Sequence, residues 1–80
     1  MHTTEMIRRF PEAPEHPILF VVYNDDMVAG TKTLIDIIHG SDYCDRYCTV
    51  VSLNTKVDDH STYDVYIDPT VYTYMHSWNN

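Results

Sequence analysis

Cysteine and histidine side chains near the middle of the chain could together hold a metal ion. Cys44 and Cys48 are separated by three residues in the segment SDYCDRYC, a spacing that zinc sites use for one pair of ligands. The two nearest histidines would complete the set, so one alternative function is a zinc-binding module with ligands His39, Cys44, Cys48 and His60. No second closely spaced ligand pair accompanies the cysteines. We therefore expect buried structural thiols, with no bound metal and no cofactor.

Redox and phosphate chemistry fit these residues less well. The C-x-x-C arrangement of thiol oxidoreductases is absent, and Arg46 is the one basic neighbour that could lower a thiol pKa. The stretch AGTKTLIDII, residues 29–38, has the lysine and threonine of a phosphate-binding loop. However, Asp26 and Thr31 occupy the positions where that loop requires glycine. The short chain also leaves little room for a substrate pocket, so we do not expect an enzyme.

The acidic residues are the remaining set of candidate functional residues, and nine of the twelve are aspartate. They recur in predicted loops and at the ends of predicted elements, where aspartate serves turns and caps and where negative charge favours solubility. A sharper hypothesis is that these carboxylates take the place of phosphates in the basic groove of another protein, with exposed tyrosines as anchors. Tyr66 and Tyr72 are further candidate anchors. The predicted partner-binding residues are Asp25, Asp26, Asp42, Tyr43, Asp45, Tyr47, Asp58, Asp59, Asp64 and Asp68.

The charge balance limits the class of partner. The formal net charge is −7, and from residue 11 onward eleven acids stand against three bases, which gives −8 for the body of the chain. Direct binding to nucleic acid needs lysine and arginine to neutralise phosphates, and an anionic membrane surface has the same requirement. The sequence therefore predicts a basic protein partner, with no direct contact to nucleic acid or membrane.

The cellular compartment is predicted from three features of the sequence. No stretch approaches the roughly 18 consecutive apolar residues that span a bilayer. The start, MHTTEMIRRF, has no apolar core of a secretory signal, and two cysteines are too few for a disulfide-stapled domain. We expect a cytoplasmic protein, or one of the host cytoplasm if the source is viral.

Four segments have the patterns of regular elements. ILFVVY (18–23) is a continuous apolar run typical of a strand buried on both faces, and CTVVSL (48–53) and YDVYI (63–67) are the next predicted strands. Residues 27–39 place apolar side chains at helical spacing, with candidate N-cap residues before them and Gly40 after them. Because glycine weakens a helix, Gly30 leaves Thr31 as an alternative start.

The two ends of the chain are less regular. Residues 1–17 combine a short helical stretch with PEAPEHP, so we expect an extended arm that precedes a single domain over residues 18–80. Asp68 and Pro69 start a helix well, and the spacing of apolar residues favours a helix over 69–78. A hairpin with residues 70–76 as its second strand remains the alternative.

These elements predict an α+β fold, a small two-layer α/β sandwich with a three- or four-stranded sheet covered by one or two helices. The first strand–helix–strand unit could form a parallel crossover. A strand edge left uncovered could pair with a second copy of the chain. A homodimer, or a self-associating structural subunit, is therefore a further alternative.

In length, acidity and tyrosine content the chain is similar to the small accessory proteins of bacteriophages that bind and inhibit host factors. Some of those proteins are DNA mimics. The resemblance is one of size and composition rather than of matched residues. It implies a non-enzymatic inhibitor that occupies a basic surface of a nuclease or another nucleic-acid-binding protein.

Overall fold

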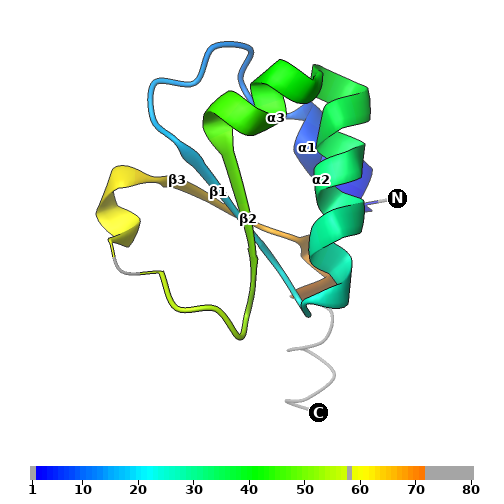
Figure 1. The fold of residues 1–80 in the computed structure, drawn as a ribbon, viewed down its shortest axis with the longest axis vertical. Helices are drawn as coiled ribbons and strands as arrows, with labels where there is room; N and C mark the ends of the chain where they lie inside the picture. Colours follow the sequence, from blue (N-terminus) through cyan, green and yellow to red (C-terminus); the bar gives the residue numbers. More distant parts are fainter. Residues whose placement is uncertain (1, 58, 72–80) are drawn as a thin grey trace.

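The computed structural model of the protein describes residues 2–57 and 59–71. Figure 1 shows the helices and strands in the order in which they follow one another along the chain. The helices are α1 (His2–Arg8), α2 (Asp26–His39), α3 (Ser41–Tyr47) and the short 3₁₀ helix η1 (His60–Thr62). The strands are β1 (Ile18–Val22), β2 (Cys48–Ser52) and β3 (Asp64–Ile67), so all three predicted strands are confirmed.

The three strands form one parallel sheet with the order β2-β1-β3. In the central strand, Ile18 lies opposite Cys48 of β2 and Asp64 of β3, and the register continues from there along both neighbours. The predicted parallel crossover from β1 through a helix to β2 is confirmed. The α+β class, with a three-stranded sheet packed against helices, is confirmed as well.

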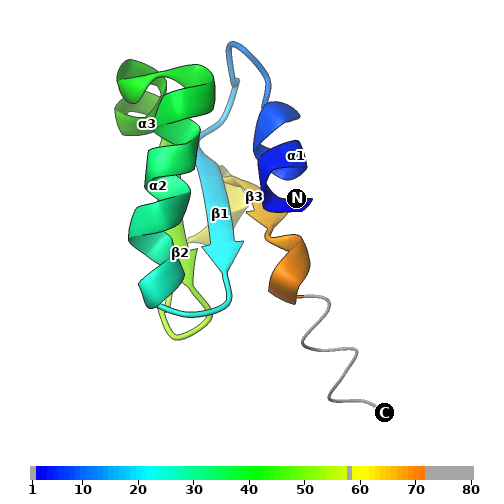
Figure 2. The ribbon, with the colours of Figure 1, turned by 90° about the vertical axis from the view of Figure 1, so that its right-hand side faces the viewer.

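One face of the sheet is covered by the helices. Side chains alternate between the two faces of a strand, and Ile18, Phe20 and Val22 of β1 all point to the helical side, where they are fully buried. Ile35 of α2 and Val50 of β2 belong to the same core. Figure 2 shows α1 and α2 side by side in front of the sheet, so both helices cover the same face.

The N-terminal segment belongs to this core. Ile7 of α1 is fully buried, and the ring of Phe10 lies 5.6 Å from that of Phe20 and 4.7 Å from that of Tyr66 in β3. The expected arm is therefore a short helix and a connector that cover the β3 side of the sheet. Burying two large apolar side chains fixes this otherwise proline-rich segment in place.

Helix α2 has the predicted position, and it runs through Gly30 rather than starting at Thr31. At its start, the side-chain oxygen of Asn24 accepts the N–H of Met27 at 3.1 Å. At its end, Gly40 has a φ of 107°, a conformation that favours glycine, and its N–H donates to the Asp36 carbonyl at 2.9 Å. This turn leads directly into α3.

No pattern in the sequence predicted a regular element over residues 41–47, and these residues form α3. The Gly40 carbonyl accepts the N–H of Cys44 at 3.1 Å, so the second helix begins where the first ends. Tyr43 and Cys44 are buried on the side that faces the rest of the core. The seven residues of α3 are mostly polar residues and tyrosines. They form a helix because of these tertiary contacts rather than because of their own helix propensity.

The opposite face of the sheet has no helical layer in the described part of the chain. The connection from β2 to β3, residues 53–63, passes on the side of the strands away from the helices and includes only η1 (Figure 1). A shallow apolar cavity lies between this connection and the strands. The prediction that β1 is buried on both faces holds for that strand. Its neighbours β2 and β3 have more exposed side chains.

After β3 the chain turns back toward α1. Residues 69–71 are helical, as the Asp68–Pro69 pair predicts, and the question of helix or strand for residues 72–78 lies outside the described residues. Tyr72, one of the candidate anchors, also lies there. None of the helices in the described ranges is long and apolar enough to cross a bilayer.

Candidate functional site

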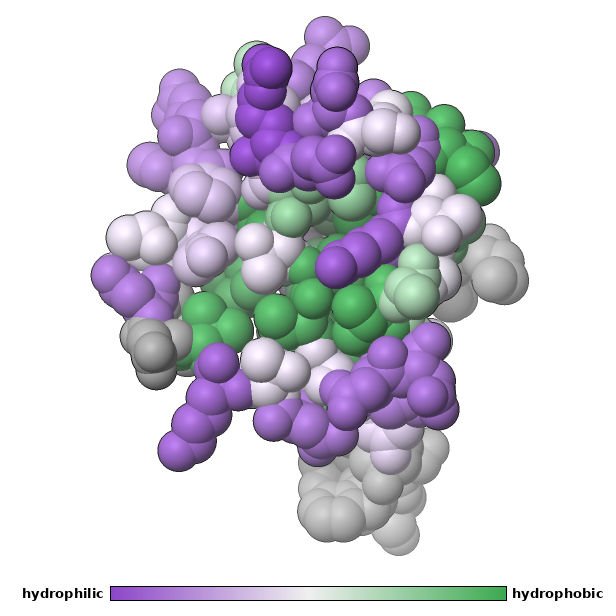
Figure 3. All heavy atoms as spheres, viewed as in Figure 1, coloured by the Kyte–Doolittle hydropathy of each residue, from purple (hydrophilic) through white to green (hydrophobic). Residues whose placement is uncertain are grey.

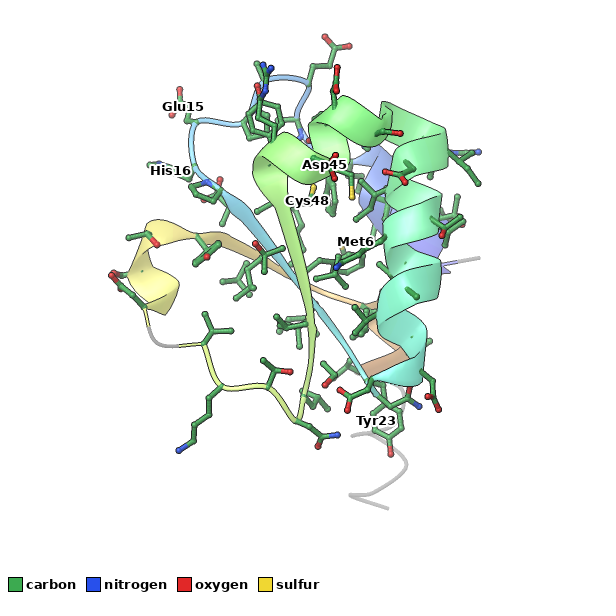
Figure 4. The ribbon with its side chains drawn as sticks, in the orientation of Figure 1. Met6, Glu15, His16, Tyr23, Asp45 and Cys48 are labelled. Carbon is green, nitrogen blue, oxygen red and sulfur yellow. The ribbon has the colours of Figure 1, made fainter. Side chains whose placement is uncertain are left out.

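Acidic side chains gather at the end of the molecule where the strands begin. Asp42 and Asp45 are exposed on α3, and Glu12 and Glu15 are exposed on the connector that precedes β1. Figure 4 shows Glu15 and Asp45 at this same end. We refer to these four residues as the acidic end. Arg46 of α3 is also exposed there, so the end is predominantly but not uniformly negative.

A row of aromatic rings holds the acidic end together. The rings of Phe10 and His39 stack at 5.8 Å, those of His39 and Tyr43 at 4.4 Å, and Tyr47 meets Tyr43 edge-on at 5.1 Å. The Tyr43 hydroxyl donates to the Pro11 carbonyl at 2.5 Å, and this bond ties α3 to the connector. These aromatic contacts and this hydrogen bond hold the two segments of the acidic end in fixed positions.

The predicted tyrosine anchors in the described part of the chain have different environments. Tyr43 is buried, so the expectation that its side chain is exposed is wrong. Burial, followed by nearby titratable groups, raises its pKa from 10.0 to about 12. Tyr47 is half-buried and remains partly accessible. Tyr66 is half-buried as well, with its ring against Phe10.

The cysteines lie beneath this end as free thiols. Cys44 is buried, and its sulfur lies 3.9 Å from the Lys32 carbonyl, while Cys48 is half-buried at the start of β2. Burial raises the pKa of both thiols, that of Cys48 to about 12, and the carboxylate of Asp36 adds to the effect at Cys44. Thiols of this kind are poor nucleophiles because the reactive thiolate is disfavoured.

The proposed zinc ligands are engaged in other contacts. His39 is stacked between two rings, and its Nε2–H donates to the Ile7 carbonyl at 2.6 Å. The side chain of His60 lies outside the described part of the structure. Among the described residues, no group of three histidine, cysteine or acidic side chains could hold a metal ion.

The opposite end, where the strands finish, carries Asp25 and Asp26. Both side chains are exposed, and the Ser52 hydroxyl at the end of β2 donates a hydrogen bond to the Asp25 carboxylate. In parallel sheets, ligands bind at the carboxyl ends of the strands where the connections diverge, which here is between β1 and β3. Asp25, bonded to Ser52, lies on the β2 side of β1 instead. Two exposed carboxylates at this end of the sheet repel anions and disfavour phosphate binding there.

Asp68 was expected at the surface, and that expectation is wrong because its side chain is 0% exposed. Its carboxylate accepts the Thr3 hydroxyl at 2.7 Å and the Thr70 N–H at 2.8 Å. It therefore caps the helical turn after β3 and joins that turn to α1. Asp59 and Asp64 are exposed, and Asp58 lies outside the described residues.

A second surface was missed from the sequence. The strand face away from the helices, together with the loop after β2, lines an apolar cavity of about 360 Å³. Figure 3 shows apolar residues gathered across the middle of the view, with polar residues above and below them. The signal was available: both alternating sets of residues in β1 are apolar, yet the connection to β3 is too short to supply a covering helix.

The chain matches no protein-family model, no curated protein and no solved structure in the comparisons made with it.

Proposed function

We propose that the protein is a small non-enzymatic binding protein that occupies a basic surface of a nuclease or another nucleic-acid-binding protein. The observation that carries this proposal is the exposure of its acids. Ten of the eleven acidic residues in the described part of the chain have exposed side chains, and Asp68 is the exception. With a formal net charge of −7, such a surface attracts a cationic partner and repels nucleic acid.

The acidic end is the part of this surface best suited to replace phosphates. Its four carboxylates come from two segments that the Tyr43–Pro11 hydrogen bond holds against each other. Fixed charges bind a complementary surface with less loss of conformational freedom than charges on mobile loops. Tyr47, half-buried beside them, adds an aromatic contact of the kind enriched at interface centres.

The environment of the reactive side chains supports a non-enzymatic role. The Nε2 of His39 and the hydroxyl of Tyr43 are both committed to backbone carbonyls. The thiols of Cys44 and Cys48 have raised pKa values. A general base or nucleophile needs a free reacting atom, which the Nε2 of His39 and the Tyr43 hydroxyl do not offer, and a thiol nucleophile needs a low pKa, which Cys44 and Cys48 do not have.

The experiment that tests the proposal is capture with a competitor. Immobilised protein is incubated with cell lysate, and bound proteins are identified after elution with duplex DNA or with rising salt. A partner that binds through its nucleic-acid groove is displaced by DNA, and its retention falls between roughly 50 and 500 mM salt because screening weakens charge contacts. Partners that ignore both DNA and salt would contradict the proposal.

Two matched variants locate the contact on the identified partner. D42N/D45N neutralises two carboxylates of the acidic end, and D26N/D36N neutralises two exposed carboxylates of α2, so the change in net charge is the same. We expect the first pair to weaken binding by about tenfold and the second pair by a few-fold at most. Equal losses would mean that overall charge, rather than the acidic end, attracts the partner.

A further inference from the structure

Strand β2 lies at one edge of the sheet, and its outer side meets no other strand in the described part of the chain. In Figure 1 it passes in front of β1 and β3, and no other described element is drawn over it. The strand reaches the surface, since Thr49 is exposed and Val51 is half-buried. The outer edge of β2 is therefore a place where another strand can be added.

The direction of the backbone groups of β2 follows from its bonds to β1. A residue of a parallel strand directs its N–H and its C=O to the same side, and the side alternates from one residue to the next. The Leu53 N–H donates to the Val22 carbonyl at 3.0 Å, so the odd-numbered residues of β2 bond to β1. The even-numbered residues Cys48, Val50 and Ser52 direct their backbone groups to the outer edge.

Two of these outward groups are already bonded within the chain. The Cys48 N–H donates to the Cys44 carbonyl, and the Ser52 carbonyl accepts the Thr55 N–H at 3.1 Å. The Val50 N–H and C=O, the Ser52 N–H and the Cys48 C=O have no hydrogen-bond partner among the described residues. Val50 is only 6% exposed and Ser52 1%. Backbone groups that lack both a partner and ready access to water destabilise a fold, and a partner strand removes that cost.

We infer that the outer edge of β2 pairs with the same edge of a second copy of the chain, antiparallel and centred on Val50. In this register the two Val50 residues exchange N–H and C=O bonds, and each Ser52 N–H donates to the Cys48 carbonyl of the other copy. The bonds that would continue the ladder need the Cys48 N–H and the Ser52 C=O, which are the two groups bonded within the chain. The unpaired groups of β2 are therefore complementary to themselves.

The charges beside β2 favour a second copy over a basic partner as the occupant of this edge. Residues 46–57 include Arg46 and Lys56 and no acid, although the chain has a formal net charge of −7. A basic partner finds no carboxylate in this stretch. Across the pair, Thr49 lies opposite the second copy's Val51, so the side chains that meet on the face away from the helices are uncharged.

The other edge of the sheet has features that oppose pairing. β3 has four residues, begins at the exposed Asp64 and is followed by Asp68 and Pro69. Short edge strands, charged residues and proline are means by which proteins prevent strands from adding to an edge. In contrast, residues 47–55 contain no charged residue and no proline. This difference identifies β2 as the edge that pairs.

Pairing at β2 joins the two three-stranded sheets into one continuous sheet, in the order β3-β1-β2-β2-β1-β3. Because the strands of the two copies run in opposite directions, the two acidic ends lie at opposite ends of the dimer. The inference goes beyond the proposed function, since it adds a contact surface to which none of the four residues of the acidic end belongs.

Amide exchange followed by NMR tests the pairing in the natural chain. We expect the Val50 and Ser52 amides to exchange at least tenfold more slowly at roughly 1 mM protein than at roughly 20 μM, because the dimer in which they are bonded becomes populated. The outward amides of Val65 and Ile67 in β3 should not change. Sedimentation over the same range should give a mass that rises toward twice the 9.4 kDa of the chain. A monomer at every concentration, or slowed exchange at β3 instead, would overturn the inference.

Matched lysine variants identify the edge. T49K places a charge on β2, V65K places one on β3, and T62K makes the same Thr→Lys change in η1; all three side chains are exposed. Lysine on an edge strand opposes pairing, so we expect T49K to weaken the dimer by about tenfold or more. V65K and T62K should leave its Kd within about twofold. Unchanged amide shifts of the helical layer check the fold of each variant. Equal effects of T49K and T62K, or a larger effect of V65K, would contradict the inference.

Salt separates the dimer from the proposed function. Each chain has a formal net charge of −7, so rising salt screens the repulsion between two copies and should leave the dimer as tight or tighter. Binding of a basic partner should weaken over the same range. A dimer that dissociates between roughly 50 and 500 mM salt would show that charge contacts hold it, and would overturn the pairing at β2. Loss of the dimer in T49K with continued capture of a DNA-displaced partner would support both proposals.

Discussion

The two faces of the sheet are made from the same three strands and have opposite surroundings. β1 supplies both. Ile18, Phe20 and Val22 lie under the helices. Leu19, which is buried, and Val21, which is half-buried, line the cavity on the face away from the helices, which we call the open face. The connection from β1 to β2 has 25 residues and folds into two helices, whereas that from β2 to β3 has eleven. The length of each connection, rather than the composition of the strands, determines which face is covered.

The largest expected effect is a difference in stability between two variants, one with a substitution on the covered face and one with a substitution on the open face. Phe20 is fully buried under the helices, and F20A should lower the free energy of unfolding by about 3–5 kcal/mol because it leaves a cavity. V65A on the open face should cost about 1 kcal/mol or less, because nearly half of that side chain is already in water. Urea denaturation of both variants measures the difference. Similar losses would show that the open face is covered in solution.

Much of the fold could be predicted from the sequence. The apolar runs and the helical stripe over 27–39 gave the strands, α2 and the parallel crossover, because these features depend on local periodicity. The cap at Asp68 and the turn at Gly40 also follow from local chemistry. The open face itself could not be inferred from β1 alone, since an apolar run has the same appearance whether one or both faces are covered.

The features that were missed depend on contacts between distant residues. Nothing local marks Ile7 and Phe10 as core residues, because they stand beside a proline-rich segment that is typical of an exposed arm. Tyr43 and Asp68 have the residue types of a surface, but stacking on His39 and bonding to Thr3 place both inside. The acidic end was predicted only in part, because Glu12 and Glu15 join Asp42 and Asp45 through the fold.

An intermediate effect is expected at the buried acid on the covered side. D68A removes the acceptor for the Thr3 hydroxyl and the Thr70 N–H, so it should cost about 1–3 kcal/mol of unfolding free energy. D59A, on the crossover beside the open face, should change stability by about 0.5 kcal/mol or less because its carboxylate is exposed. Chemical denaturation near neutral pH compares the two. A neutral D68A would contradict the assignment of Asp68 as a structural cap.

The smallest expected effect is a loss of stability at high pH, caused by titratable side chains on the covered face. Folding raises the pKa of Cys48 from 9.0 to about 12, so between these values the thiol ionises in the unfolded chain and stays protonated in the folded one. Stability is therefore complete below a pH of about 9 and falls as the pH rises toward 12. Tyr43, whose pKa is also raised to about 12, acts in the same direction from its ordinary value of 10.0.

Urea midpoints measured across this pH range test the origin of that loss. C48A should reduce the slope of stability against pH, because it removes one of the groups that ionise only on unfolding. L53A should keep the slope of the natural chain, because the residues lining the cavity of the open face have no titratable side chains. An unchanged slope in C48A would place the titrating groups elsewhere. A reduced slope in L53A would show instead that the open face is coupled to the ionisations beneath the helices, and that the two faces do not act independently.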